Sequence, residues 1–440
     1  MKNRNLIFIT LIITLLVSGT LPGSLVWGGS SNEASASIAN MAYPLPNKPS
    51  FAVLPFNDTS GDAEPKYLCE GFTNTLFDAL SENLGVFVIS TMSTSKYKGK
   101  AFSAKQVAEE LGVQYVVKGD FAKSGDQLKI SVQMIDALKG TSVWSQSYDH
   151  KMSDILKIQN DITLNMIKSA GAKYDNLIVE GRTVEGTNNV EAYLKYINAF
   201  DISWQGTPEG HRKAKELYQQ AIALDPNYLK PHIGLVHVWV EEARWGFSEE
   251  PQKALESAHN FAQTAIDLDK SDSQAYTAMG RALYNLKEHD KAITTFEQAI
   301  ALDPENTWAH EMLGWTLCYA GRSQEAIPAF KAMRRSNPLN PEWSFGGLGA
   351  ANLFAGKYEE AIPYYQKMIE GGSKHYRAYL DLAACQVALG RQEEAQVNCK
   401  KVMQLNPKFT LTKHITRLPA KDPEYVKPYT QALQKLDLPK

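Results

Sequence analysis

The sequence predicts an α/β domain, built on a mixed sheet with helices, followed by an all-α solenoid of stacked helix pairs. The first unit is indicated by strand-like and helix-like stretches that alternate between residues 50 and 180. The second is indicated by a period in the C-terminal half, where Ala292, Ala326, Ala361 and Ala395 are spaced by 34, 35 and 34 residues. A chain of 440 residues has room for both units.

In the first unit, helical spacing of apolar residues alternates with short apolar runs that end in turn residues. The expected strands cover residues 51–56, 86–89, 114–122, 127–135 and 142–148, and the expected helices cover residues 67–84, 104–111 and 154–168. This order is typical of a mixed sheet with helices packed on it. The proline-bearing stretch 37–49, just before this unit, is expected to be a linker.

These elements carry a family resemblance. The matching motifs, in order along the chain, are residues 52–56, 71–73, 97–100, 110–119 and 132–137, then Trp144 and residues 148–149. They resemble the TolB amino-terminal-like domain, which is related to the FlgO family. Related bacterial proteins fuse that domain to tetratricopeptide repeats, often downstream of a class III adenylate or guanylate cyclase domain. The resemblance implies a docking or sensing role for residues 50–180 rather than a known reaction.

In the second unit, the turn that closes each period repeats as well, in the form Leu-Asp-Pro or a close variant. Gly280, Gly314 and Gly349 recur where paired helices would cross too closely for a side chain, and proline ends most periods because it cannot extend a helix. The pattern resembles the tetratricopeptide repeat. It implies about six helix pairs over residues 190–408, a capping segment over 409–440, and an insertion in the second pair around residues 241–251.

Such arrays bind peptides or protein surfaces on the concave face, which the first helix of each pair lines. The repeat register predicts a protein-binding groove formed by Arg281, Tyr284, Trp308, Glu311, Trp315, Tyr319, Trp343 and Arg377. Exposed aromatic side chains beside arginine are what binding hot spots use. The alternative for each tryptophan is packing between neighbouring repeats.

Composition limits the other classes of protein. The chain is 44% hydrophobic and 21% charged, as folded proteins are, and its 46 basic and 48 acidic residues leave a net charge of −2. Because there is no basic excess to meet phosphates, nucleic acid is not an expected partner. Four cysteines are too few for a disulfide scaffold. We expect them to be buried small side chains, with a disulfide between Cys385 and Cys399 as the alternative.

The N-terminus has the layout of an export signal. Lys2 and Arg4 precede an apolar run over residues 6–17, and the Ala-Ser-Ala sequence at 34–36 offers the small side chains of a cleavage site. We therefore expect residues 1–36 to be a signal peptide that sends the mature chain to the periplasm or cell envelope.

An uncleaved anchor in the inner membrane is the alternative. Residues 6–27 are uncharged and about long enough to cross a bilayer, and the basic residues before them keep the N-terminus inside. Both alternatives export the rest of the chain, and the second adds membrane association.

No catalytic, cofactor-binding or metal-binding residues are predicted. The glycine–lysine pairs of the chain lack the partners of a phosphate loop, and its histidines form no metal-ligand spacing. The sequence therefore favours a non-enzymatic, exported scaffold that binds other proteins. The alternative is a regulatory component of an adenylate or guanylate cyclase-type signalling system that lacks its own catalytic domain.

Overall fold

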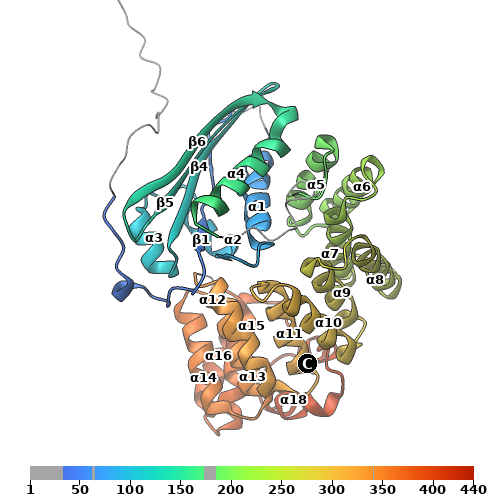
Figure 1. The fold of residues 1–440 in the computed structure, drawn as a ribbon. Coiled ribbons are helices and arrows are strands. Elements are labelled where there is room, and N and C mark those ends of the chain that lie inside the picture. The colour runs from blue at the N-terminus through green and yellow to red at the C-terminus, as the bar shows by residue number, and fades with distance from the viewer. Residues whose placement is uncertain (1–32, 62–64, 173–184, 340) are drawn as a thin grey trace, which may run out of the picture.

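The computed structural model describes residues 33–61, 65–172, 185–339 and 341–440 (Figure 1). Most of the predicted export segment, residues 1–32, lies outside the described residues. Within the described part, no helix combines the length and the apolar character needed to cross a membrane.

The α/β domain is built on one mixed sheet. Its strands are β1 (Ser50–Val53), β2 (Asn57–Asp58), β3 (Phe87–Val88), β4 (Tyr115–Ser124), β5 (Gln127–Asp136) and β6 (Thr141–Lys151). The order is β3-β1-β4-β5-β6, with β2 also paired to β4. β1 pairs in parallel with β3 and β4, and β2 pairs in parallel with β4, whereas β5 pairs antiparallel with both β4 and β6. The predicted strand 51–56 is shorter in the structure: β1 ends at Val53, before Pro55, which has no backbone N–H to donate. β2, which was not predicted, follows at Asn57.

Helices cover both faces of this sheet. They are α1 (Tyr67–Ser81), α2 (Thr91–Thr94), α3 (Ala104–Leu111) and α4 (Ile155–Ser169). On one face, α1 and α4 share a core with the strands through residues such as Phe72, Ile162 and Val117. On the other face, α3 packs through Val107 on a smaller core that includes Val116. The predicted α/β class is therefore confirmed.

Residues 33–42, from the end of the predicted export segment and the linker, lie on this domain. The Glu33 carboxylate accepts the Ala104 N–H at the start of α3 (2.8 Å) and pairs with Lys118 Nζ (3.0 Å). The Glu33 N–H donates to Gly140 O (2.8 Å), and buried Ala36 donates to Ala137 O (2.7 Å). This segment is thus part of the fold.

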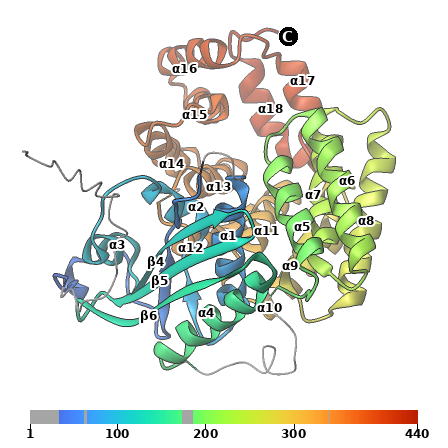
Figure 2. The ribbon, with the colours of Figure 1, turned by 90° about the horizontal axis from the view of Figure 1, so that it is seen from above.

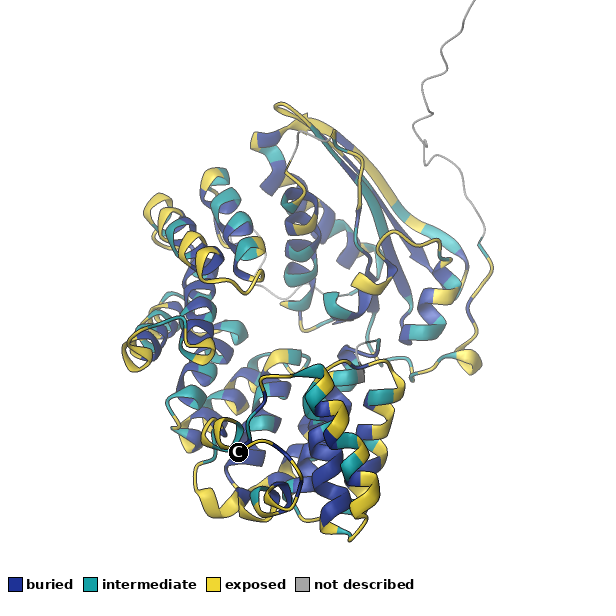
Figure 3. Ribbon diagram, turned by 180° about the vertical axis from the view of Figure 1, so that it is seen from behind, coloured by how far each residue is buried: buried dark blue, intermediate teal, exposed yellow. Residues whose placement is uncertain are grey.

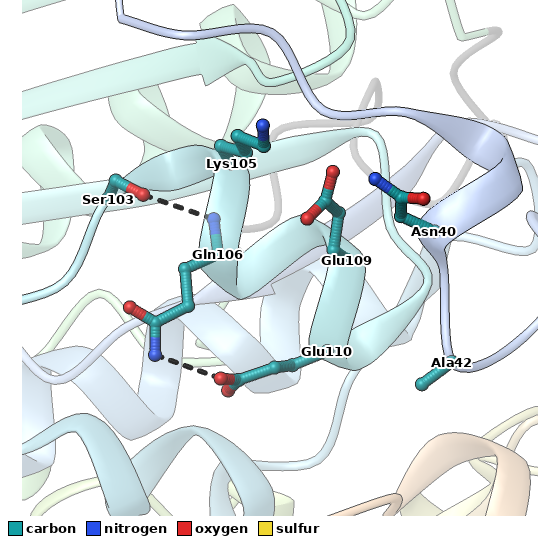
Figure 4. A pocket seen from close by; sticks show the side chains of 7 residues that line it. All are labelled: Asn40, Ala42, Ser103, Lys105, Gln106, Glu109 and Glu110. Atoms are coloured by element: carbon teal, nitrogen blue, oxygen red, sulfur yellow. Dashed lines mark hydrogen bonds between the residues drawn. The ribbon is translucent and has the colours of Figure 1, made fainter.

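A shallow pocket separates the same segment from α3 (Figure 4). Its lining residues are Asn40, Ala42, Ser103, Lys105, Gln106, Glu109 and Glu110. Several of these polar groups satisfy one another, since Ser103 caps α3 through the Gln106 N–H and Gln106 donates to Glu110 (2.8 Å). Ser103, Gln106 and Glu110 are therefore bonded to one another within the pocket wall.

The second unit is a succession of antiparallel helix pairs. Within the described residues there are six pairs: α5 (Val190–Ser203) with α6 (Pro208–Leu224), α7 (Leu229–Trp245) with α8 (Pro251–Leu268), α9 (Ser273–Asn285) with α10 (His289–Leu302), α11 (Thr307–Tyr319) with α12 (Ala326–Ser336), α13 (Pro341–Phe354) with α14 (Tyr358–Glu370), and α15 (Tyr376–Ala388) with α16 (Gln392–Leu405). After them come α17 (Leu411–Thr416), a 3-10 turn η6 (Pro423–Val426) and α18 (Lys427–Gln434). The predicted solenoid is confirmed, and Figure 3 shows its exposed residues on the outward faces of the helices.

The glycines lie at the close helix crossings that the sequence predicts. A Cβ on Gly280 would lie 2.5 Å from the Phe296 ring of the paired helix. A Cβ on Gly314 would lie 2.6 Å from Phe330, and one on Gly349 would lie 2.8 Å from Tyr365. Each glycine therefore lets an aromatic ring of the second helix reach the backbone of the first.

The second pair is longer than the third because both of its helices are longer. α7 and α8 have 17 and 18 residues, whereas α9 and α10 have 13 and 14. The extra residues around 241–251 thus lengthen both helices, and Gly246, with a φ of +75°, ends α7.

The α/β domain and the first repeat share one core. The side of α1 packs so closely on α5 that a Cβ on Gly71 would lie 2.9 Å from Ile197 Cβ. Beside this contact, Gln159 of α4 donates to the Tyr193 hydroxyl of α5 (3.0 Å). Lys230 of α7 pairs with Glu185 (3.3 Å) and lies 3.9 Å from Asp78 of α1.

A second contact joins the α/β domain to the fourth repeat. Ser93 of α2 donates to Asn337 Oδ1 (2.6 Å), and Arg335 donates to the Gly112 carbonyl at the end of α3 (2.9 Å). The Arg335 guanidinium also lies over the Phe87 ring, 4.4 Å from its centre. Figure 2 shows the repeats passing around the α/β domain, from α5 to α8 on one side to α13 to α16 beyond α2.

Candidate protein-binding groove

The first helices of the six pairs line one inner face. Neighbouring first helices touch from α5 to α7 and onward to α15, so side chains at equivalent positions follow one another along this face. The face has two parts. The part formed by α5, α7, α9 and the start of α11 is called the open half here, and the part formed by the end of α11, α13 and α15 is called the covered half.

The open half presents a pair of exposed tryptophans. Trp204, at the end of α5, is 52% exposed, and Trp308, at the start of α11, is 40% exposed. Their ring centres lie 6.1 Å apart, and the His237 ring of α7 lies 4.7 Å from Trp204. The curvature of the solenoid thus brings the first and fourth repeats together at one aromatic patch.

A charged cluster lies beside the two tryptophans. The buried Glu241 carboxylate of α7 accepts from Arg244 (2.8 Å), Arg281 (3.2 Å) and the Trp245 indole (2.7 Å). Burial raises the pKa of Glu241, but Arg244 and Arg281 outweigh it and leave the pKa below its ordinary value. Glu241 is therefore ionised, and it fixes the direction of both guanidinium groups.

His237 is held neutral in this cluster. Burial, and next the Arg281 charge, lower its pKa to about 3. Its Nδ1 atom lies 3.3 Å from an Arg281 nitrogen, so the neutral ring can accept a hydrogen bond there. The histidine thus helps to position Arg281 rather than adding charge.

Glu311 is the other acid of the open half. Burial raises its pKa to about 7, against the opposing effects of Arg281 and of a hydrogen bond with Trp315. Its protonation therefore changes near neutral pH.

This shift gives a pH-dependent stability. The free carboxyl of Glu311 titrates near 4.5 and the folded one near 7, so the folded state binds more protons between these values and loses stability as pH rises through them. We expect Glu311→Gln to match the wild type at pH 5 and to exceed it by on the order of 2 kcal/mol at pH 8. Urea unfolding at both pH values measures this; a difference that does not change with pH would contradict it.

The covered half holds two of the predicted residues, Tyr319 and Arg377, in a buried network. Arg377 of α15 donates to the Tyr319 hydroxyl (2.5 Å) and pairs with Asp381 (3.4 Å). The Tyr429 hydroxyl of α18 donates to the other Asp381 oxygen (2.6 Å). Tyr319 and Tyr429 are each 2% exposed, so the C-terminal segment lies over these groups.

The three predicted tryptophans differ in their surroundings. Trp308 and Trp343 are exposed, and Trp343 lies 6.4 Å from His375. Trp315 packs edge-on against Phe330, with ring centres 5.5 Å apart, as the alternative of inter-repeat packing describes. Tyr284 is partly buried between Tyr319 and His289. Ligand contact by the predicted set stays a prediction.

Sequence reasoning missed five residues of the open half. They are Trp204, His237, Glu241, Arg244 and Trp245. The first pair departs from the repeat pattern and the second is lengthened, so the register did not extend to them. The local sequence holds one signal that could have indicated them, since Trp204 lies just after the end of α5 and Trp245 lies at the end of α7.

The cysteines form no disulfide. Cys69, Cys318, Cys385 and Cys399 are all free and buried. Burial raises the pKa of Cys399 to about 11, and it raises the pKa of the other three thiols as well. The expectation of buried small side chains is met, and the alternative disulfide does not form.

Comparison with known families identifies the repeats. Tetratricopeptide repeat models match residues 273–306, 311–373 and 353–409, which confirms the repeat type predicted from the sequence. The second half is thus a scaffold of the tetratricopeptide class, whose members bind other proteins or peptides. Over residues 47–165 the matching model is the second domain of HilA/YgeH-like transcriptional regulators.

Two curated relatives match more than half of this chain. A protein of Rhizobium meliloti (strain 1021) that bears the name of an adenylate cyclase is 30% identical over 271 residues, which is 61% of this chain and 46% of the relative. The transcriptional regulator HilA of Salmonella typhimurium is 22% identical over 311 residues, 68% of this chain and 53% of HilA. The chain thus spans about half the length of these relatives.

Solved structures resemble the repeats only distantly. PilW, a type IV pilus biogenesis factor, has a TM-score of 0.44 and 16% identity, covering 52% of this chain and 99% of PilW. PilF of Pseudomonas aeruginosa has a TM-score of 0.40 and 20% identity, covering 50% of this chain and 93% of PilF. At these scores the likeness carries no argument about function.

Proposed function

We propose that this chain is a non-enzymatic, exported scaffold that binds protein partners of the cell envelope through the open half of the groove. The observation that carries the proposal is the aromatic patch of Trp204 and Trp308 beside the fixed guanidinium of Arg281. Exposed tryptophan next to arginine is the composition of binding hot spots, and the first-helix face is where repeat proteins of this class take their partners.

The geometry favours a partner segment with an apolar or aromatic side chain. Two tryptophan rings that are about half exposed leave apolar area in contact with water, which is unfavourable until a partner covers it. Because Glu241 already neutralises part of the arginine charge, shape and apolar contact contribute more here than net charge does.

Removal of both rings should abolish partner capture. We expect Trp204→Ala/Trp308→Ala to reduce crosslinked partners recovered from the cell envelope at least about tenfold, since truncation of a hot-spot side chain costs about 2 kcal/mol or more. Val397→Ala, which shortens an exposed apolar side chain on the second helix α16, is the matched control. Equal recovery by the double variant and this control would refute the groove as the binding site.

The α/β domain would serve as a docking or sensing unit. Its motifs over residues 52–149 resemble the TolB-like domain, and that resemblance supports the assignment alongside the match to the HilA/YgeH-like second domain. Both likenesses concern a domain that works next to other modules. The shared core with α5 supports a role that acts together with the repeats.

We propose that export leaves residues 33–36 attached to the mature chain. The contacts of Glu33 with α3 and Lys118, and of buried Ala36 with Ala137, would be lost by cleavage after Ala36. These contacts favour the uncleaved inner-membrane anchor, or a cut before Glu33, over a mature chain that begins at Ser37.

The N-terminal residue of the protein recovered from cell envelopes tests this proposal. We expect mass spectrometry of the intact protein to place the N-terminus at or before Glu33, in the membrane fraction if the anchor is retained. A mature chain that starts at Ser37 would rule out a structural role for Glu33, and recovery from the cytoplasm would rule out export.

The second candidate is a regulatory component of an adenylate or guanylate cyclase-type system. The relative named as an adenylate cyclase, 30% identical over 271 residues, favours it. We expect the purified chain with magnesium or manganese to turn over no ATP or GTP above a heat-denatured control. Turnover would overturn the non-enzymatic proposal, whereas a changed rate of an added class III cyclase would favour the regulatory role.

A further inference from the structure

The covered half of the groove is filled by the end of the chain itself. Residues 419–438, called the tail here, leave α17, run back along the edge of the third and fourth repeats, and then place α18 against α13 and α15. The last residues then bond to α16 and α17, since Gln392 donates to Lys435 O (3.3 Å) and the Leu411 N–H donates to Pro439 O (2.8 Å). Figure 2 shows α18 beside α17.

Polar contacts hold the first part of the tail. Pro419 O lies 2.6 Å from His289 Nε2 at the start of α10. The Lys421 N–H donates to Tyr319 O (2.9 Å) at the end of α11, and Lys421 Nζ pairs with Asp290 (2.6 Å). The tail is thus tied to the loops of two repeats that precede the last one.

The second part of the tail is an amphipathic turn and helix. Val426, Tyr429, Leu433 and Leu436 recur at spacings of three and four residues, which places them on one face, and all four are buried. Tyr429 packs edge-on against Phe354 of α13, with ring centres 5.4 Å apart. This is how a helix binds in a groove, through anchors on a single face.

The groove meets the tail with charged groups as well as apolar ones. Tyr429 reaches Asp381, and Asp381 is paired with Arg377, which also bonds Tyr319. Asp381 is 3% exposed, and an apolar cap over the last repeat would not require a buried ion pair. Without the tail, Arg377 and Asp381 would line the groove as a recognition pair for a hydroxyl group.

The outer side of the tail is in water. Asp422, Glu424 and Lys427 are exposed, and Tyr425 is 43% exposed although its ring lies against Gly321. The tail therefore lies on the surface of the groove with one face bound, and it can leave without unfolding anything stacked above it.

We propose that the covered half is a second binding site, for an amphipathic helix that presents a tyrosine to Asp381, and that the tail is its built-in competitor. This inference rests on the proposed function, since it extends the same first-helix face from the open half. A partner helix with the spacing of Val426, Tyr429 and Leu433 would replace the tail and lengthen the available groove. The tail thus keeps the charged floor of the groove covered until such a helix is present.

The test uses the full chain with a specific protease site inserted between the exposed Thr416 and Arg417. The protein folds with its tail in place and is then cut, and gel filtration removes the freed tail. Binding of a fluorescein-labelled peptide with the sequence of residues 417–440 is measured by polarisation on cut and uncut protein. We expect the cut protein to bind the peptide at least tenfold more tightly than the uncut protein.

Two peptide variants identify the contact. Tyr429→Phe removes the hydroxyl that bonds Asp381 and lies 3.0 Å from His414 Nε2, and it should weaken binding about tenfold. Tyr425→Phe removes the hydroxyl of a side chain that is 43% exposed and should leave binding unchanged. Circular dichroism of the cut protein verifies that the repeats stay folded.

Three results would overturn the inference: a tail that stays bound through gel filtration, a peptide that binds uncut protein as tightly as cut protein, or equal losses from both variants. Failure of the proposed function is separate from these results. It would appear as unchanged partner capture by Trp204→Ala/Trp308→Ala, whose side chains do not touch the tail peptide.

Discussion

Phe330→Ala should cost about 3–5 kcal/mol of the free energy of unfolding, the usual range for loss of a buried phenylalanine. Phe330 is fully buried, and its ring fills the space against two glycines of successive first helices, Gly314 and Gly347. Alanine would leave an empty volume between three helices that the rigid repeat stack cannot close. Urea unfolding followed by circular dichroism measures the loss.

The matched control is Val397→Ala, which shortens a side chain that is 68% exposed. We expect it to change the unfolding free energy by less than about 0.5 kcal/mol, as surface changes do. If Phe330→Ala lost no more than this control, the interlocking of ring and glycine would not be a main source of repeat stability.

Lys230→Met should also cost about 3–5 kcal/mol, because it leaves a buried carboxylate without its partner. The Glu185 side chain is fully buried, and Lys230 Nζ lies 3.3 Å from it and 3.9 Å from Asp78. The lysine thus compensates acids at the joint between the α/β domain and the second repeat. Thermal and urea unfolding of the variant measure the loss.

A double variant separates charge from packing. Glu185→Gln/Lys230→Met removes both charges, and replacing a buried ion pair by neutral groups is close to neutral in other proteins. We expect it to recover most of the stability that Lys230→Met loses. A double variant as unstable as the single one would show that lost packing, not an unpaired charge, explains the effect.

The sequence was most informative where structure depends on neighbours along the chain. The spacing of Gly280, Gly314 and Gly349 predicted the close helix crossings, because each glycine meets an aromatic ring of its own repeat. Most strands of the α/β domain were predicted to within a few residues of their ends for the same reason. The main differences are the early end of β1, before Pro55, and β2, which was not predicted.

The groove was harder to predict because it depends on distant contacts. Trp204 and Trp308 are 104 residues apart, and only the curvature of the solenoid brings their rings to 6.1 Å. The burial of Tyr319 and Arg377 depends on the tail, which a repeat register treats as a cap at the end of the array. The repeat period predicts which residues face inward, but it does not predict which of them another segment of the chain covers.

The two joints between the α/β domain and the repeats have a mechanical consequence. One joint is at α5 in the first repeat and the other is at Asn337, after the fourth repeat. The α/β domain therefore links the two ends of an arc of four repeats (Figure 1). In a solenoid whose repeats contact only their neighbours, no contact between distant repeats fixes the curvature. Here the α/β domain holds both ends of the arc, so the spacing of Trp204 and Trp308 is set before any partner arrives. A partner of the proposed site would therefore lose less conformational entropy on binding.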